Sequence, residues 1–167
     1  MPALEAGVRA PEINLSFLDG RKFSLAETLK DGPVVLAFFK VSCPVCQFAF
    51  PYLERIFKVY GQNGKFTFVG VSQDNAKDTQ AFNRECGVTF PVLLDEKEKK
   101  YPVSNAYGLT NVPTVFMISP EGEIVFSSVS WSREEMQQLA DRLAELNAAS
   151  PAQIFPPAEK VPEFKPG

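Results

Sequence analysis

The chain has 167 residues, of which 45% are hydrophobic and 22% charged, and this size and balance predict one compact domain rather than a disordered chain. The net charge of −3 argues against nucleic-acid and anionic-membrane partners, because neither is attracted to an acidic protein. The sequence contains no histidine, which excludes Ser–His and Cys–His catalysis and imidazole metal sites, so we expect no metal and no other cofactor.

The first predicted element is a β-hairpin at a sheet edge, because segments 14–18 and 22–24 flank the turn pair Asp19-Gly20. The apolar run Val34–Phe39 follows, and its β-branched and aromatic residues predict a strand buried on both faces. That run is too short to cross a bilayer. No signal peptide is recognisable at the N-terminus, so we expect a cytoplasmic protein without membrane insertion, unless a signal has been removed.

Two cysteines follow this strand in the order Cys43-Pro44-Val45-Cys46. Apolar residues then recur at helical spacing and form one stripe: Ala49, Leu53, Ile56, Phe57 and Tyr60. The cysteine pair therefore lies where a buried strand leads into the first turn of a helix, and Pro44 suits that turn because it lacks an N–H group. Unpaired backbone N–H groups and the positive helix end stabilise a thiolate at Cys43. Cys46 lies one turn further on, close enough to attack a mixed disulfide at Cys43.

A Cys-x-x-Cys pair permits a metal site, a structural disulfide or a redox-active pair. A four-thiolate metal site needs a second pair, and the sequence has only one more cysteine, Cys86. A structural disulfide across so short a loop gains little stability. The pattern therefore favours redox cycling, with Cys43 as the attacking thiol and Cys46 as the resolving thiol. We expect Cys86 to pack in the core rather than to act as a regulatory or second resolving thiol.

Further downstream the sequence predicts strands alternating with helices and then a second hairpin. Four apolar segments indicate strands: 66–71, 91–94, 114–118 and 124–129. One helix, capped by Asp74 or Asn75, is expected to end at Cys86, and a last helix begins with the capping box Ser132-Arg-Glu-Glu135. The charged segment 95–100 between them is typical of a solvated turn. This order predicts an α/β sandwich with a mixed central sheet.

Composition changes after Ser150, where five prolines in residues 151–167 exclude a helix or a central strand. We therefore expect a domain at 1–150 and a Pro-rich extended tail at 151–167. Two states of the tail are compatible with its sequence. It packs through Ile154, Phe155 and Phe164, or it stays mobile.

Three segments together resemble the thioredoxin superfamily, in particular its redoxin branch, which includes the AhpC/TSA proteins. They are the strand with Cys43-Pro-Val-Cys46 and Phe50-Pro-Tyr-Leu53, the segment 87–95, and the segment 107–116 with Val112-Pro113-Thr114. The resemblance covers about residues 7–148. It implies a thioredoxin-like sandwich, with the mixed sheet flanked by helices and preceded by the hairpin. It also implies a cis peptide bond at Pro113, opposite the cysteines.

In this family the cis-proline loop and the residues between the thiols face the substrate. The resemblance therefore implies that Val112 offers its backbone to an extended protein segment beside Pro113, with Pro44 and Val45 completing the substrate-binding surface. The implied activity is thiol–disulfide exchange by a monomer. Its partners would be disulfide-containing proteins as substrates and a thiol/disulfide protein as electron donor.

Two other functions compete with this one. A thiol peroxidase would use Cys43 as the peroxidatic and Cys46 as the resolving cysteine. Typical peroxiredoxins carry Thr or Ser where this chain has Lys40, and a downstream Arg that is missing between Arg84 and Arg133. A binding protein with a vestigial pair would form no reversible disulfide. For the leading function, Ala37 and Ala49 stand where related proteins keep a buried acid, so the sequence identifies no base for the resolving thiol.

Overall fold

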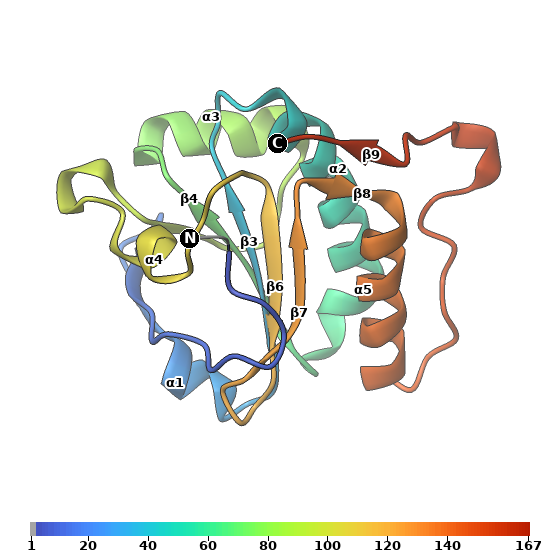
Figure 1. The fold of residues 1–167 in the computed structure, drawn as a ribbon, viewed down its shortest axis with the longest axis horizontal. Coiled ribbons are helices and arrows are strands. Elements are labelled where there is room, and N and C mark those ends of the chain that lie inside the picture. The colour runs from blue at the N-terminus through green and yellow to red at the C-terminus, as the bar shows by residue number, and fades with distance from the viewer. Residues whose placement is uncertain (1–2) are drawn as a thin grey trace.

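Seven strands form one mixed sheet at the centre of the molecule, and helices cover both faces of it (Figure 1). The computed structural model describes residues 3–167. The strands of this sheet are β1 (Asn14–Phe17), β2 (Lys22–Ser24), β3 (Val34–Phe39), β4 (Thr67–Ser72), β5 (Val92–Leu94), β6 (Thr114–Ile118) and β7 (Ile124–Val129). Their order in space is β2-β1-β5-β4-β3-β6-β7. Strands β3, β4 and β5 run parallel and the other neighbours antiparallel, which confirms the predicted mixed sheet and N-terminal hairpin.

The helices are α1 (Leu25–Leu29), α2 (Pro44–Tyr60), α3 (Ala76–Cys86), α4 (Pro102–Ala106) and α5 (Arg133–Leu146). Figure 1 shows α2 and α5 on one face of the sheet and α1 and α4 on the other. Both α1 and α4 have five residues, too few for a recognisable apolar stripe, and neither was predicted. No helix of residues 3–167 is long and apolar enough to span a membrane.

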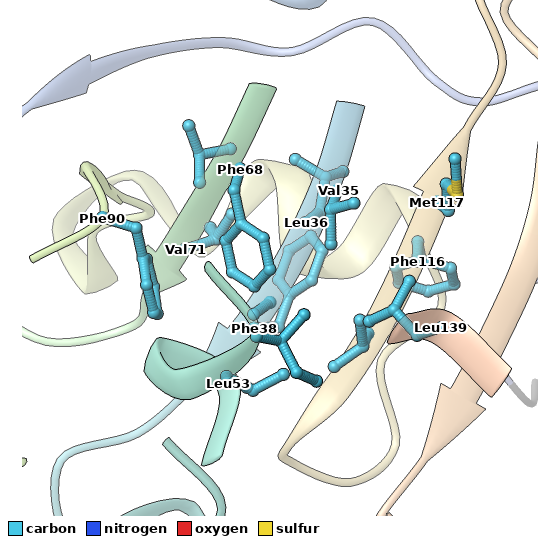
Figure 2. Close-up of a cluster of buried hydrophobic side chains, with 14 of the residues drawn as sticks. Val35, Leu36, Phe38, Leu53, Phe68, Val71, Phe90, Phe116, Met117 and Leu139 are labelled. Atoms are coloured by element: carbon cyan, nitrogen blue, oxygen red, sulfur yellow. The ribbon is translucent and has the colours of Figure 1, made fainter. Parts of the chain in front are cut away.

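The core is built around β3, whose six residues are all buried. Neighbouring side chains of this strand point to opposite faces of the sheet. The Phe38 ring packs against Tyr107 and Phe116, with ring centroids 5.6 and 5.7 Å apart. The Phe39 ring packs against Phe50 of α2, at 4.4 Å between centroids. Figure 2 shows side chains from β3, β4 and β6 gathered with those of α2 and α5 in this cluster. Because both faces of β3 are covered, its residues do not alternate between apolar and polar. This confirms the strand buried on both faces that the apolar run Val34–Phe39 predicted.

The predicted helix starts are confirmed with one difference. Asn75 caps α3 by accepting a hydrogen bond from the Asp78 N–H (2.8 Å). Ser132 caps α5 by accepting from the Glu135 N–H (3.2 Å). The Glu135 carboxylate does not complete the predicted capping box, because it accepts a hydrogen bond from the Ser128 hydroxyl of β7 (2.8 Å). The last helix is thereby tied to the sheet edge.

The charged segment 95–100 is not wholly a solvated turn, because Asp95 is fully buried. Its carboxylate accepts hydrogen bonds from the N–H groups of Val103 (3.1 Å) and Ser104 (2.7 Å). Those groups lie in the first turn of α4, where no carbonyl of the helix can reach them. The prediction of a solvated turn was wrong for Asp95, since it considered only the charged neighbours and not the helix that follows.

The Pro-rich tail runs from the end of α5 back to the start of α2 (Figure 1), and buried side chains pack it against the domain. Ile154 and Phe155 are buried, as expected if the tail packs, whereas Phe164 is 61% exposed. Phe164–Lys165 forms strand β9, which pairs antiparallel with β8 (Trp131–Ser132). Of the three side chains through which the tail could have packed, Phe164 does not take part, because the backbone of this strand and not the aromatic ring makes the contact.

Candidate active site

Cys43 lies at the N-cap of α2, after a three-residue loop that follows the central strand β3. Its backbone is extended (φ −82°, ψ 115°), and its sulfur accepts a hydrogen bond from the Cys46 N–H at 3.3 Å. Pro44 occupies the first turn of the helix, as predicted. The sulfur therefore takes the place of an N-cap oxygen. This hydrogen bond and the positive end of α2 both stabilise negative charge on Cys43 Sγ.

The loop before β6 meets the same sulfur atom. The Cys43 thiol donates to the Val112 carbonyl oxygen, with 3.5 Å between Sγ and O, across 69 positions of sequence. The Val112–Pro113 peptide bond is cis, which confirms the prediction made from the family resemblance. The Thr114 hydroxyl donates to the Asn111 carbonyl (2.7 Å) and so fixes the loop on both sides of the cis bond. The structure thus brings together Cys43, Val112 and Pro113.

Cys46 has a different environment from Cys43, although both are free thiols. It is fully buried, and this burial raises the pKa of its thiol far above the ordinary value. The neighbouring Cys43 sulfur and the Asp74 carboxylate raise that pKa further, while a hydrogen bond from the Lys40 backbone opposes them. Cys43 is only half-buried. The two thiols therefore differ in access in the direction that an attacking and a resolving cysteine require.

The two residues between the thiols lie at the surface. Pro44 is exposed and Val45 is half-buried, and Ser42 on the other side of Cys43 is exposed as well. Solvent and larger molecules can therefore approach Cys43 from this side. The substrate-facing role that the family resemblance implies for Pro44 and Val45 stays a prediction.

Asp74 belongs to this site, although the sequence indicated it only as a possible helix cap. Its carboxylate accepts a hydrogen bond from the Val41 N–H (2.8 Å), two residues before Cys43, and its own N–H donates to the Ser72 hydroxyl (3.1 Å). The active-site loop after β3 is thereby tied to the loop after β4. These two strands are parallel neighbours, so their carboxyl ends meet at one edge. That topology is the signal that could have revealed Asp74.

A buried acid exists on α2, but it is not at the family positions 37 and 49, which hold buried alanines. Glu54 is 4% exposed, and its carboxylate accepts hydrogen bonds from the N–H groups of Thr89 (2.7 Å) and Phe90 (3.3 Å). The Thr89 hydroxyl donates to it as well. These three bonds engage Glu54 in holding the segment before β5 against α2, which is a structural task.

Cys86, which we expected to pack in the core, is only half-buried. It ends α3 and packs against the edge of the core, with its sulfur 3.9 Å from the Gln47 carbonyl oxygen of α2. Partial burial raises the pKa of its thiol, and the charge of Glu85 raises it further. Neither effect stabilises a thiolate, and the position of Cys86 at the C-terminal end of α3 also disfavours negative charge on its sulfur.

A Cys-x-x-Cys pair at the start of a helix, following the central strand and facing a cis-proline loop, defines a thioredoxin-like redox protein. The chain belongs to the AhpC/TSA family, whose model matches residues 6–127. It is an oxidoreductase of the thioredoxin-like redoxin group, as its curated relatives and structural neighbours also indicate.

Curated relatives include the thiol-disulfide oxidoreductase ResA of Geobacillus thermodenitrificans, which is 31% identical over 123 residues, covering 73% of this chain and 68% of the relative. ResA of Bacillus subtilis is 32% identical over 124 residues, covering 74% and 66%. This chain therefore spans about two thirds of the length of these relatives. Among solved structures, the thioredoxin domain of a thiol-disulfide oxidoreductase from Bacteroides vulgatus is similar, with a TM-score of 0.72 and 26% identity, covering 84% of this chain and 98% of that domain.

Proposed function

We propose that this protein reduces or exchanges disulfides in partner proteins, using Cys43 and Cys46 as its redox pair. The position of the Cys43 sulfur carries the proposal. It lies within hydrogen-bond distance both of the Cys46 N–H at the start of α2 and of the Val112 carbonyl beside Pro113. The nucleophile, the resolving thiol and a backbone edge for docking a substrate therefore lie at one place.

The reaction proceeds in two exchange steps. The Cys43 thiolate attacks one sulfur of a substrate disulfide, the substrate S–S bond breaks, and the released thiolate takes up a proton. Cys46 then loses its proton and attacks the Cys43 sulfur of the mixed disulfide. The substrate leaves with both of its cysteines reduced, and Cys43 and Cys46 are left joined by a disulfide. A thiol/disulfide protein acting as electron donor reverses these steps and restores the dithiol.

Docking uses the surface around Cys43. An extended substrate segment lies along the backbone of Val112 beside Pro113, where main-chain groups can recognise it without regard to its side chains. Pro44 and Val45 border the same surface on the helix side. Neither residue is charged, so substrate specificity at this surface depends on shape and on main-chain contacts.

Two expectations from the sequence accompany this proposal. The cytoplasmic location expected from the N-terminal sequence and the monomeric state both stay predictions. Gel filtration of the reduced protein tests the second, with elution at the size of a single chain as the expected result.

Catalytic reduction of insulin by dithiothreitol tests the function. The wild-type protein should accelerate insulin precipitation, Cys43→Ser should abolish the acceleration, and Cys86→Ser should retain it as the matched control. Peroxide provides the opposing test, because a peroxidase stabilises the leaving oxygen with fixed donors. Rapid oxidation of Cys43 by hydrogen peroxide, several orders of magnitude faster than that of free cysteine and with little insulin reduction, would instead identify a thiol peroxidase.

A further inference from the structure

The C-terminal tail follows a fixed path over α2, beginning with three anchors at Ile154, Phe155 and Glu159. Ile154 is 1% exposed, and its carbonyl accepts a hydrogen bond from the Arg55 guanidinium of α2 (2.7 Å). The same guanidinium binds both carboxylate oxygens of Glu159, at 2.8 and 3.1 Å. The Phe155 ring packs against Tyr52 and Trp131, at 5.4 and 5.6 Å between ring centroids. The first part of the tail is thus held by burial and by a bidentate ion pair.

The next part of the tail leads back toward the cysteines. The Trp131 indole N–H donates to the Pro162 carbonyl (2.8 Å), and the Arg133 N–H donates to the Glu163 carbonyl (2.9 Å). Strand β9 then runs beside β8, and the Lys165 ammonium lies 5.0 Å from the centroid of the Phe48 ring. Phe48 is two residues after Cys46 on α2. Figure 1 shows the marked C-terminal end close to the start of that helix.

The last residue described reaches the cis-proline loop itself. The Gly167 N–H donates to the Ser130 hydroxyl (3.0 Å), and the Asn111 side-chain amide donates to the Gly167 oxygen (2.9 Å). A Cβ atom added at Gly167 would overlap the Val112 carbonyl oxygen and lie 2.8 Å from its carbon. Only glycine brings a backbone so close to this group. The same carbonyl oxygen accepts the hydrogen bond from the Cys43 thiol.

We propose that segment Phe164–Gly167 occupies the docking position beside Pro113 and competes there with protein substrates. The inference rests on the proposed function, which assigns substrate docking to the Val112 backbone. The segment begins as the strand Phe164–Lys165 and places the backbone of Gly167 against the Val112 carbonyl, where the proposed function places the backbone of a substrate. The docking position beside Pro113 should therefore accept a chain whose glycine faces Val112. A chain with a larger residue at the place of Gly167 should dock less well.

The segment is built to leave its position without unfolding the tail. Phe164 is 61% exposed and Lys165 is half-buried, so release uncovers little apolar surface. The anchors at Ile154, Phe155 and Glu159 lie outside the segment and hold the rest of the tail during release. The segment therefore acts as a tethered competitor, present at high local concentration whenever no substrate is bound.

Deletion of residues 164–167 tests the proposal, because it keeps the Trp131–Pro162 and Arg133–Glu163 hydrogen bonds. A segment seated about nine-tenths of the time predicts a KM for insulin about tenfold lower after deletion, with kcat unchanged. Oxidised glutathione, which is too small to need the whole docking edge, should show a smaller change. Phe164→Ala is the matched control. It should leave the KM for both substrates unchanged, because the ring is exposed and the strand pairing uses backbone groups.

A synthetic peptide of residues 161–167, amidated at its C-terminus, provides the reverse test. It should restore the higher KM when added to the shortened protein, and the peptide with Gly167→Ala should do so less effectively. The rate at which a bulky maleimide alkylates Cys43 measures how far the segment covers this thiol, and it does not depend on catalysis. This rate should be several-fold higher after the deletion. Equal KM and equal alkylation in the full and shortened proteins would overturn the proposal and leave the function intact. Faster alkylation without insulin reduction by either protein would support the cover and contradict the function.

Discussion

Cys43 and Cys46 are three positions apart, yet the structure gives their sulfur atoms opposite environments. Cys43 is half-buried, receives a hydrogen bond from the backbone of α2 and donates one to Val112. Cys46 is fully buried, and burial raises the pKa of its thiol. This difference supports the proposal that Cys43 is the attacking thiol and that Cys46 resolves a mixed disulfide held close to it.

Replacement of the resolving thiol should expose this division of labour. Cys46→Ser keeps attack by Cys43 but removes the second exchange step, so mixed disulfides with substrate proteins should accumulate. They should appear on a non-reducing gel after incubation with intact, disulfide-bonded insulin or a cell extract. Cys43→Ser should form none of these adducts. Equal trapping by the two variants would contradict the assigned roles.

The raised pKa of Cys46 predicts how stability changes with pH. Above the ordinary thiol pKa of about 8.5, the unfolded chain releases this proton while the folded protein retains it, so the free energy of unfolding falls as pH rises. The contribution is complete below that pH. Between pH 8 and 9.5 the reduced protein should lose about 1 kcal/mol more than Cys46→Ala. This range stays below the ordinary pKa of Tyr107, whose pKa is also raised by burial.

Urea unfolding at several pH values measures this difference. The oxidised wild-type protein is a second control, because its Cys43–Cys46 disulfide has no thiol to titrate. If the reduced protein and Cys46→Ala lose the same free energy over this range, Cys46 is not the buried neutral thiol described.

At the scale of elements, the start of α2 depends on the loop that follows β4. Asp74 in that loop binds the Val41 N–H, so the loop fixes the strand-to-helix turn that carries Cys43. Asp74→Ala leaves a backbone donor without its partner, and we expect it to cost about 1–3 kcal/mol in unfolding free energy. The exposed Asp78 offers a matched control, and Asp78→Ala should change stability by less than about 0.5 kcal/mol.

Asp74→Asn separates the charge of this side chain from its hydrogen bond. The amide oxygen still accepts from Val41, but the negative charge that helps to raise the pKa of Cys46 is gone. The resolving step should therefore be faster than in the wild type at neutral pH, measured as release of substrate from a preformed mixed disulfide. A slower step in Asp74→Asn would indicate that the carboxylate accepts the Cys46 proton.

The elements that could be predicted are those with a local pattern. The apolar run of β3, the stripe of α2 and the proline after Cys43 each depend on neighbouring residues, so the strand, the helix and the thiol pair were located from sequence. The fold alone brings three other residues close to the groups that they contact: Asp74, Asp95 and Gly167. Asp74, for example, binds Val41 across 33 positions of sequence. Their roles were missed because no short-range pattern encodes them.

At the scale of the whole molecule, the tail from 151 to 167 contributes to stability as well as to cover of the site. Ile154, Phe155 and Val161 are buried among residues of the domain, and burial of each apolar side chain is worth about 1.5–3 kcal/mol. Deletion of residues 151–167 should therefore lower the unfolding free energy by about 4 kcal/mol or more. Deletion of 164–167 alone removes no buried apolar side chain and should lower it by about 1.4 kcal/mol, the free energy that corresponds to a segment seated about nine-tenths of the time.

Urea denaturation of the two shortened proteins and the full chain gives this comparison directly. We expect the unfolding free energy to fall slightly after deletion of 164–167 and much further after deletion of 151–167. Equal stability of all three proteins would mean that the tail does not pack in solution as the structure describes, and the tethered competitor would lose its anchor.

The central claim is that Cys43 and Cys46 form a reversible disulfide, and redox titration in glutathione buffers tests it most directly. The protein is equilibrated at stepped ratios of reduced to oxidised glutathione, its free thiols are alkylated, and the modified residues are located by mass spectrometry. We expect Cys43 and Cys46 to lose their alkylation together in one two-electron transition, with Cys86 alkylated throughout. The transition should be the same from the oxidised and the reduced side. A disulfide involving Cys86, or no reversible transition at all, would contradict the account.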